Sequence, residues 1–119
     1  SENYFRKIEN DITLQVLKRK NSVISLGGGA FLNKSIRSSA KEKSISFWLD
    51  VDIVKLIERL KKSKKRPLLY KKNISDTVKK IYIEREKIYS KADYRIKCSS
   101  LKTKEIVDKI LKLYENAGN

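Results

Sequence analysis

Three consecutive glycines, Gly27, Gly28 and Gly29, stand out in a chain that contains only four glycines. They follow residues 22–26, a short apolar run after Asn21 that predicts a buried strand. In an open α/β sheet, ligands bind beyond the carboxyl ends of the strands, and glycine lets backbone N–H groups approach a substrate or phosphate. We therefore interpret the triplet as a ligand-binding turn. The alternative is a turn that needs only a positive φ.

Two arginines occupy positions where a cation needs an explanation. Arg6 lies in the first turn of a predicted helix, where the helix dipole disfavours positive charge. Its side chain is therefore either simply solvated or close to an anionic group. Arg85 falls on the apolar stripe of another predicted helix, so its guanidinium must reach solvent, pair with a carboxylate or meet a ligand. Arginine binds carboxylates and phosphates with better geometry than lysine.

Two further groups of charged residues are open to two interpretations each. The lysine-rich run over residues 61–73 contains Arg66 and the single proline, Pro67. It is either a solvated loop or a lid that closes over a nucleotide and supplies positive charge to a transferred phosphoryl group. Asp50 and Asp52 are close enough in sequence to suggest a metal site. Because Asp50 ends a predicted strand and Asp52 can cap the next helix, capping is the favoured interpretation.

Composition limits the classes of function. The 119 residues allow one modest core, and no apolar run approaches the roughly 18 residues of a membrane span. The absence of histidine excludes histidine-based acid/base catalysis and most transition-metal sites. The single cysteine, Cys98, cannot form an internal disulfide, which favours the cytoplasm. The net charge of +15 favours anionic ligands, although a lysine-rich codon bias would produce the same excess.

Hydrophobic spacing predicts that strands and helices alternate along the chain. Residues 45–49 and 94–96 form short apolar runs typical of strands. Apolar residues recur at helical spacing over residues 3–18, 53–60, 75–89 and 106–113. The first helix carries Phe5, Ile8, Ile12 and Val16, and the third begins at a Ser75 cap and buries Val78, Ile81, Tyr82, Ile88 and Tyr89. This order predicts an α/β sandwich with parallel strands.

Four groups of residues, taken in chain order, resemble the shikimate kinases. The groups are Phe5-Arg6-Lys7-Ile8-Glu9, Ser25-Leu26-Gly27-Gly28-Gly29-Ala30, Arg66-Pro67-Leu68-Leu69, and Arg85 followed by Ile88-Tyr89 and Ala92-Asp93. The separations also fit that family, with 21 positions from Arg6 to Gly27 and 19 from Arg66 to Arg85. The resemblance covers nearly the whole chain. It implies a three-layer α/β sandwich of the P-loop kinase type, built on a parallel sheet.

The resemblance also implies an activity, which is the ATP-dependent phosphorylation of the shikimate 3-hydroxyl on the chorismate pathway to aromatic amino acids. Such an enzyme would be a cytoplasmic monomer whose ligands are shikimate, ATP and Mg²⁺, without a nucleic-acid or membrane partner. Arg6 and Arg85 match the family's arginines that grip the shikimate carboxylate, and Glu9 matches an acidic residue that orients the substrate site. Gly28 matches a glycine whose backbone contacts shikimate, with Gly27 and Gly29 shaping the turn.

The nucleotide side of the predicted site rests on two residues. Arg66 matches the catalytic lid arginine that contacts ATP and stabilises charge on the phosphates. Lys102 falls near a basic position on the adenine side. The resemblance thus predicts a substrate-binding part over residues 1–30, a lid loop over 61–74, and the last strand and C-terminal helices over 75–119.

One departure from the family is large. The phosphate-binding motif Gly-x-x-x-x-Gly-Lys-Ser/Thr does not occur in the 119 residues, and neither does the aspartate that binds the phosphorylated hydroxyl. We expect both, together with the Mg²⁺ ligands, in a segment before Ser1, so that residues 1–119 form a single partial kinase domain. Without the P-loop strand, buried backbone groups would lose ladder partners at about 1–3 kcal/mol each. We therefore expect the chain to fold poorly and to be inactive by itself.

Two other classes of function remain open from the residues. The first is a non-catalytic remnant that holds shikimate or another anion through Arg6 and Arg85. The second is a basic nucleic-acid-binding domain, which requires aromatic residues among cations on one exposed face. Trp48, Tyr82 and Tyr89 lie instead on predicted buried stripes or strands, which disfavours the second class.

Overall fold

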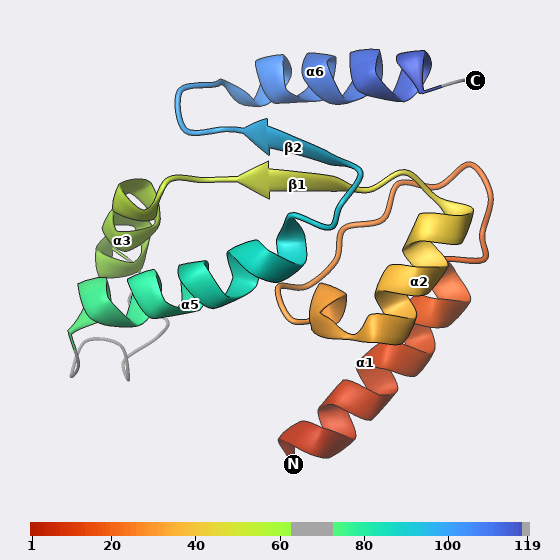
Figure 1. The fold of residues 1–119 in the computed structure, drawn as a ribbon, viewed down its shortest axis with the longest axis horizontal. Helices are drawn as coiled ribbons and strands as arrows, with labels where there is room; N and C mark the ends of the chain where they lie inside the picture. Colours follow the sequence, from red (N-terminus) through yellow and green to blue (C-terminus); the bar gives the residue numbers. More distant parts are fainter. Residues whose placement is uncertain (63–72, 118–119) are drawn as a thin grey trace. The chain divides into compact units, whose positions relative to one another are not determined.

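The computed structural model describes residues 1–62 and 73–117. The chain divides into two compact units, Ser1–Ser46 and Phe47–Asn119, and each is described here by itself (Figure 1). The predicted lid residues Arg66 and Pro67 lie outside the described residues. The predicted organisation as one partial domain stays a prediction.

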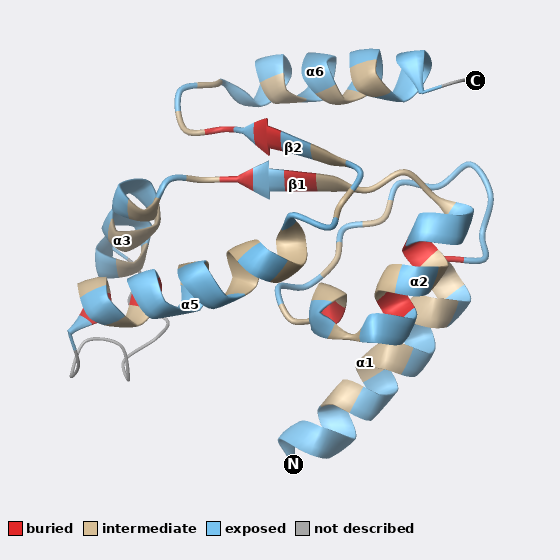
Figure 2. Ribbon diagram, in the orientation of Figure 1, coloured by how far each residue is buried: buried red, intermediate tan, exposed pale blue. Residues whose placement is uncertain are grey.

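The first unit is helical. It contains α1 (Glu2–Val16), a short 3-10 helix, η1 (Ala30–Leu32), and α2 (Lys34–Lys43). The Ser1 hydroxyl oxygen accepts from the Tyr4 N–H at the start of α1, and Asn33 Oδ1 accepts from the Ile36 N–H at the start of α2. These contacts satisfy backbone donors that have no partner within a helix. The buried residues Leu17, Ala30, Ile36 and Ala40 form the core of this unit (Figure 2).

The first predicted helix is confirmed, but most of its apolar face is exposed. Phe5, Ile8 and Ile12 are exposed, whereas Leu14 and Leu17 pack in the core of the unit. The reason is that the core lies beside the C-terminal end of α1. The N-terminal part of the apolar stripe therefore finds no cover within this unit.

The predicted buried strand over residues 22–26 is also wrong. The segment is extended but pairs with no strand among the described residues. Val23 is 103% exposed, while Ile24 and Leu26 on the opposite side pack against the core of the unit. The burial of these side chains alternates as it does in a strand, but among the described residues no neighbouring strand pairs with them.

The second unit carries the sheet. Strands β1 (Phe47–Asp50) and β2 (Tyr94–Lys97) run parallel, with Phe47 opposite Tyr94 and Asp50 opposite Lys97. Helices α3 (Ile53–Lys62) and α5 (Ile74–Tyr89) lie between the strands in sequence, as parallel pairing requires. The predicted strands over 45–49 and 94–96 are thus confirmed, as are the helices that follow and precede them.

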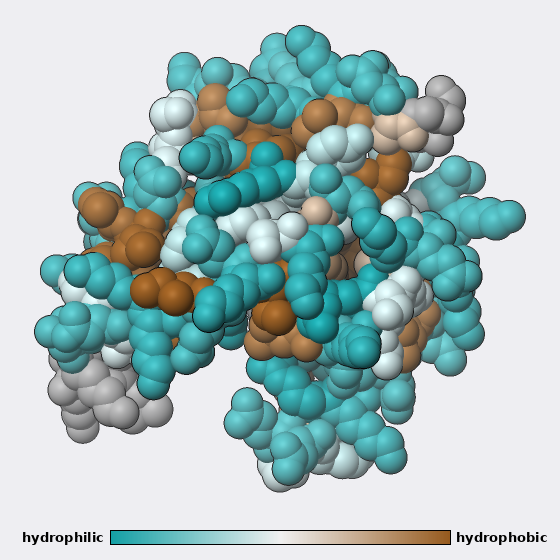
Figure 3. All heavy atoms as spheres, viewed as in Figure 1, coloured by the Kyte–Doolittle hydropathy of each residue, from teal (hydrophilic) through white to brown (hydrophobic). Residues whose placement is uncertain are grey.

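The chain closes with α6 (Thr103–Asn116), which contacts β2. In Figure 3, hydrophilic residues cover the outer side of α6 and apolar residues lie toward the strand. Within residues 1–62 and 73–117, no helix combines the length and apolarity needed to cross a bilayer.

Two details of the helices differ from the sequence prediction. Helix α2 was not predicted, although Ile36 and Ala40 have helical spacing and Asn33 is a favourable cap. Helix α5 is capped by the Asn73 side chain rather than by Ser75, and Ile81 is 41% exposed rather than buried.

Candidate functional site

The first candidate site lies in the first unit, where α1 presents a charged pair. Arg6 Nη1 donates a hydrogen bond to Glu9 Oε1 at 2.7 Å, three residues further along the helix. The Glu9 side chain is only 19% exposed, so its carboxylate interacts more strongly with the guanidinium than a fully solvated one would. Arg6 therefore lies close to an anionic group, Glu9, which is one of the two alternatives predicted from its position in the helix.

The glycine turn lies directly against this pair. A Cβ atom at Gly29 would lie 2.6 Å from Arg6 Cζ, and a Cβ atom at Gly27 would lie 3.3 Å from Glu9 Oε2. Gly29 has a φ of −94°, a value open to any residue, so the positive-φ interpretation is wrong at this position. Glycine is needed here because the guanidinium occupies the space of a side chain. Gly28, between them, is exposed.

Arg85 lies in the second unit on α5 and is half-buried. Among residues 1–62 and 73–117 it has neither a carboxylate partner nor a hydrogen-bond acceptor for its side chain. This differs from Arg6, which pairs with Glu9, and from Arg95, which pairs with Asp50. Because Arg6 and Arg85 belong to different units, their convergence on one carboxylate stays a prediction.

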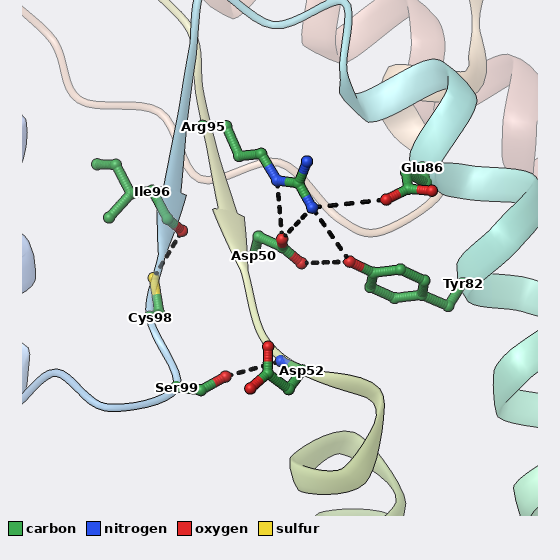
Figure 4. A network of polar contacts seen from close by, with 8 residues as sticks. All are labelled: Asp50, Asp52, Tyr82, Glu86, Arg95, Ile96, Cys98 and Ser99. Carbon is green, nitrogen blue, oxygen red and sulfur yellow. Dashed lines mark hydrogen bonds and ion pairs between the residues drawn. The ribbon is translucent and has the colours of Figure 1, made fainter.

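A buried polar network in the second unit was not predicted from the sequence. Asp50, at the end of β1, is 3% exposed. Its Oδ2 accepts from Arg95 Nε at 2.8 Å, and its Oδ1 accepts from the Tyr82 hydroxyl at 2.8 Å (Figure 4). The signal was present, because Asp50 follows Trp48 by two residues on one face of a strand, and a buried carboxylate needs a cation.

This environment changes the titration of three side chains. Burial, together with the hydrogen bond to Asp50, raises the pKa of the Tyr82 phenol above its usual value. The hydrogen bond to Asp50 raises the pKa of Arg95, whose guanidinium also lies 4.4 Å from the centre of the Trp48 ring. Burial raises the pKa of the Cys98 thiol. All three groups are therefore held in their protonated forms at neutral pH.

The remaining predicted residues have structural contacts of their own. The Lys102 backbone N–H donates to Glu105 Oε1 at 2.9 Å, and its side chain is exposed. The Asp52 backbone N–H donates to Ser99 Oγ at 2.8 Å, in the turn between β1 and α3. The part of the chain that the structure describes contains no group of three or more Asp, Glu, Cys or His side chains able to hold a metal.

Comparison with known proteins gives one consistent family. The family model for shikimate kinase matches residues 1–115. The shikimate kinase of Aquifex aeolicus is 36% identical over 116 residues, which cover 98% of this chain and 68% of that protein. The shikimate kinase of Bartonella henselae is 38% identical over 95 residues, and that of Bartonella quintana is 32% identical over 115 residues. The chain spans 45% and 55% of the lengths of these two Bartonella proteins.

Solved structures agree with the sequence comparison. The crystal structure of Aquifex aeolicus shikimate kinase has a TM-score of 0.80 at 37% identity and covers 96% of this chain and 66% of that one. An Acinetobacter baumannii shikimate kinase, solved in complex with shikimate, has a TM-score of 0.82 at 26% identity and covers 97% and 65%. The predicted α/β fold of the P-loop kinase type is thereby confirmed. The chain belongs to the shikimate kinase family.

Proposed function

We propose that these residues form the shikimate-binding part of an enzyme that transfers the γ-phosphoryl group of ATP to the 3-hydroxyl of shikimate. The observation that carries the proposal is the arrangement in the first unit, where Arg6, Glu9 and the turn at Gly27 and Gly29 lie within contact of one another. These are the positions at which the sequence resembles the family's substrate site. The contact between this helix and this turn supports the proposal.

The proposed roles follow from the chemistry of the side chains. Arg6 and Arg85 donate charge-assisted hydrogen bonds to the shikimate carboxylate. Glu9 holds Arg6 Nη1 and so restricts the directions in which the guanidinium points. Gly28 offers its backbone to the ring because no side chain intervenes. Fixing the ring in this way holds the 3-hydroxyl in line for phosphoryl transfer, which accounts for a large share of catalysis in such reactions.

The nucleotide side is proposed from the sequence. Arg66 would contact ATP and stabilise charge on the phosphates, and Lys102 would lie toward the adenine. The reaction also needs a phosphate-binding loop and Mg²⁺ ligands, which this sequence of 119 residues does not supply. We further propose that the active protein is a cytoplasmic monomer on the route to aromatic amino acids.

The proposal is tested first by binding. Titration calorimetry with shikimate should give saturable binding to the 119 residues when they are joined to the phosphate-binding segment of the Aquifex aeolicus relative. In this joined protein, Arg85→Ala should weaken binding by about 10- to 150-fold, as the loss of a hydrogen bond to a charged group predicts. Lys87→Ala is a matched control, because Lys87 is a cation on the same helix and is exposed. Absence of binding, or equal losses in the two variants, would contradict the proposal.

Turnover is tested separately. We expect no phosphorylation by the 119 residues alone, and ATP-dependent phosphorylation of shikimate when they are joined to the phosphate-binding segment of the Aquifex aeolicus relative. Loss of that turnover in Arg66→Ala, with shikimate binding retained, would support the proposed role of the lid arginine.

A second candidate is a non-catalytic shikimate- or anion-binding protein. The observation in its favour is that the 119 residues contain no P-loop motif. It predicts the same binding results but no turnover in the joined protein, so the second experiment separates the two functions.

A further inference from the structure

Asp50 is a buried carboxylate with hydrogen-bond donors on both of its oxygens. Its side chain is 4% exposed, and both oxygens of its carboxylate accept hydrogen bonds. Arg95 provides two nitrogens to Oδ2, with Nε at 2.8 Å and Nη2 at 2.7 Å, while the Tyr82 hydroxyl donates to Oδ1 at 2.8 Å. Several donors hold a buried carboxylate in one orientation, because hydrogen bonds weaken steeply away from linear geometry.

The network joins three elements of the second unit (Figure 4). Trp48 and Asp50 lie on one face of β1, and Arg95 lies opposite Trp48 in the parallel register, so that its side chain extends along the same face to Asp50. The Arg95 guanidinium also lies 4.4 Å from the Trp48 ring centre. Tyr82 approaches the carboxylate from α5. The carboxylate therefore ties both strands to the helix.

The contacts of α5 are divided along its length. Its buried apolar residues, Ile74 and Val78, belong to the first half of the helix. In the second half, Ile81 and Ile83 are exposed. That half contacts the sheet through polar and aromatic side chains. Tyr82 donates a hydrogen bond to Asp50, and Glu86 pairs with Arg95. The ring centroids of Tyr89 and Trp48 are 6.0 Å apart.

Arg85 belongs to that second half. It lies three residues after Tyr82 and immediately before Glu86, on the stripe that turns toward the network. A rotation of the helix that broke the Tyr82–Asp50 hydrogen bond would turn Arg85 by the same angle, because a helix moves as a rigid element about its axis.

We propose that Asp50, together with Tyr82 and Arg95, is a positioning group that fixes the direction of the Arg85 guanidinium for the substrate carboxylate. The inference rests on the proposed function, because it requires that Arg85 bind shikimate. None of the three residues needs to touch the substrate. Their effect on shikimate binding passes through Arg85 alone.

The test is a double-mutant cycle with shikimate as the ligand and, as the protein, the 119 residues joined to the phosphate-binding segment of the Aquifex aeolicus relative. Tyr82→Phe keeps the ring and removes one hydrogen bond to Asp50, and we expect it to weaken shikimate binding by about 3- to 10-fold. Lysine has no planar group whose direction must be fixed. In an Arg85→Lys background, Tyr82→Phe should therefore change Kd by less than about 2-fold. Asp50→Asn should act in the same direction as Tyr82→Phe and more strongly.

Controls separate positioning from loss of fold. Tyr94→Phe makes the same chemical change on β2, where the ring stacks on Phe47, and should leave Kd unchanged. The emission maximum of Trp48, the single tryptophan, shows directly whether each variant keeps its packing. If Tyr82→Phe shifts that emission to the unfolded value, the conservative Arg95→Lys variant replaces it in the cycle.

The outcomes distinguish this inference from the proposed function. A wild-type chain that does not bind shikimate overturns both. Shikimate binding that depends on Arg85 but shows equal effects of Tyr82→Phe in both backgrounds overturns the positioning role and leaves the proposed function standing. Loss of the Tyr82 effect in the Arg85→Lys background supports the inference.

Discussion

At the scale of single residues, the arrangement of Gly29 and Arg6 predicts a specific effect of a small substitution. Gly29→Ala introduces a methyl group where the Arg6 guanidinium lies, although the φ of −94° suits alanine. We expect the flexible arginine to move, leaving the free energy of unfolding within about 1 kcal/mol of wild type while shikimate binding weakens. Urea denaturation and titration calorimetry measure the two effects.

Gly27→Ala is the matched control for that substitution. Its added Cβ would lie 3.3 Å from Glu9 Oε2, a contact that a small shift relieves. It should therefore weaken binding less than Gly29→Ala. The reverse order, or a large loss of stability in Gly29→Ala, would show that the turn does not serve the guanidinium.

Tyr82 predicts a pH dependence of stability. Its pKa is raised by burial and by Asp50, so the folded chain keeps the phenol proton at a pH where the unfolded chain has lost it. The contribution of Tyr82 to stability is therefore complete below about pH 10 and is lost as the pH rises through the folded pKa. We expect the difference in unfolding free energy between wild type and Tyr82→Phe to shrink above about pH 10. A difference that stays constant from about pH 8 to about pH 11 would contradict this assignment.

Cys98 predicts slow thiol chemistry in the folded protein. The side chain is 7% exposed, its Sγ lies 3.2 Å from the Ile96 carbonyl oxygen to which it donates, and burial raises its pKa. Because the thiolate is the reactive form, an aromatic disulfide reagent at about pH 8 should modify Cys98 far more slowly before denaturation than after it. Equal rates in the two states would mean that the end of β2 opens readily.

At the scale of elements, the core of the first unit depends on α2. Ile36 is 0% exposed and packs with Leu17, Ala30 and Ala40. Ile36→Ala should lower the free energy of unfolding by about 2–5 kcal/mol, because the methyl groups removed leave a cavity. Ile83→Ala, on an exposed side of α5, should change it by about 0.5 kcal/mol or less. Urea denaturation compares the two, and similar losses would contradict the assigned core.

The same scale shows what the sequence could predict and why. Strands β1 and β2 and the helices α1, α3, α5 and α6 were predicted because their apolar residues recur with the period of one element. The prediction of a strand over residues 22–26 was wrong. An apolar run indicates that a segment tends to extend, but it does not indicate that another strand pairs with it. Helix α2 was missed because only Ile36 and Ala40 in it are buried, too few to show a period.

The sites divide in a similar way. The glycine triplet and Arg6 were singled out from the residues themselves, and Glu9 was found through the family resemblance. The structure brings Arg6 and Glu9 into contact with the turn at Gly27 and Gly29. The network around Asp50 was missed because Arg95 and Tyr82 lie 45 and 32 residues away from Asp50 in sequence, and only the folded chain brings them together. The position of Arg85 on α5 was predicted from the periodicity of that helix.

At the scale of the whole molecule, we propose that the guanidinium groups of Arg6 and Arg85 both bind the carboxylate of shikimate. The claim is chemical, so it can be tested by changing the ligand instead of the fold. Esterification of the shikimate carboxylate removes its charge and leaves the ring hydroxyls in place. The effects of Arg6 and Arg85 should then depend on which ligand is titrated.

The decisive measurement is therefore the calorimetric Kd of wild type, Arg6→Gln and Arg85→Gln for shikimate and for its methyl ester. The account predicts that each substitution weakens shikimate binding by about 10-fold or more and changes ester binding by less than about 2-fold. Equal losses for the two ligands in either variant would mean that this arginine does not bind the carboxylate, and would contradict the account.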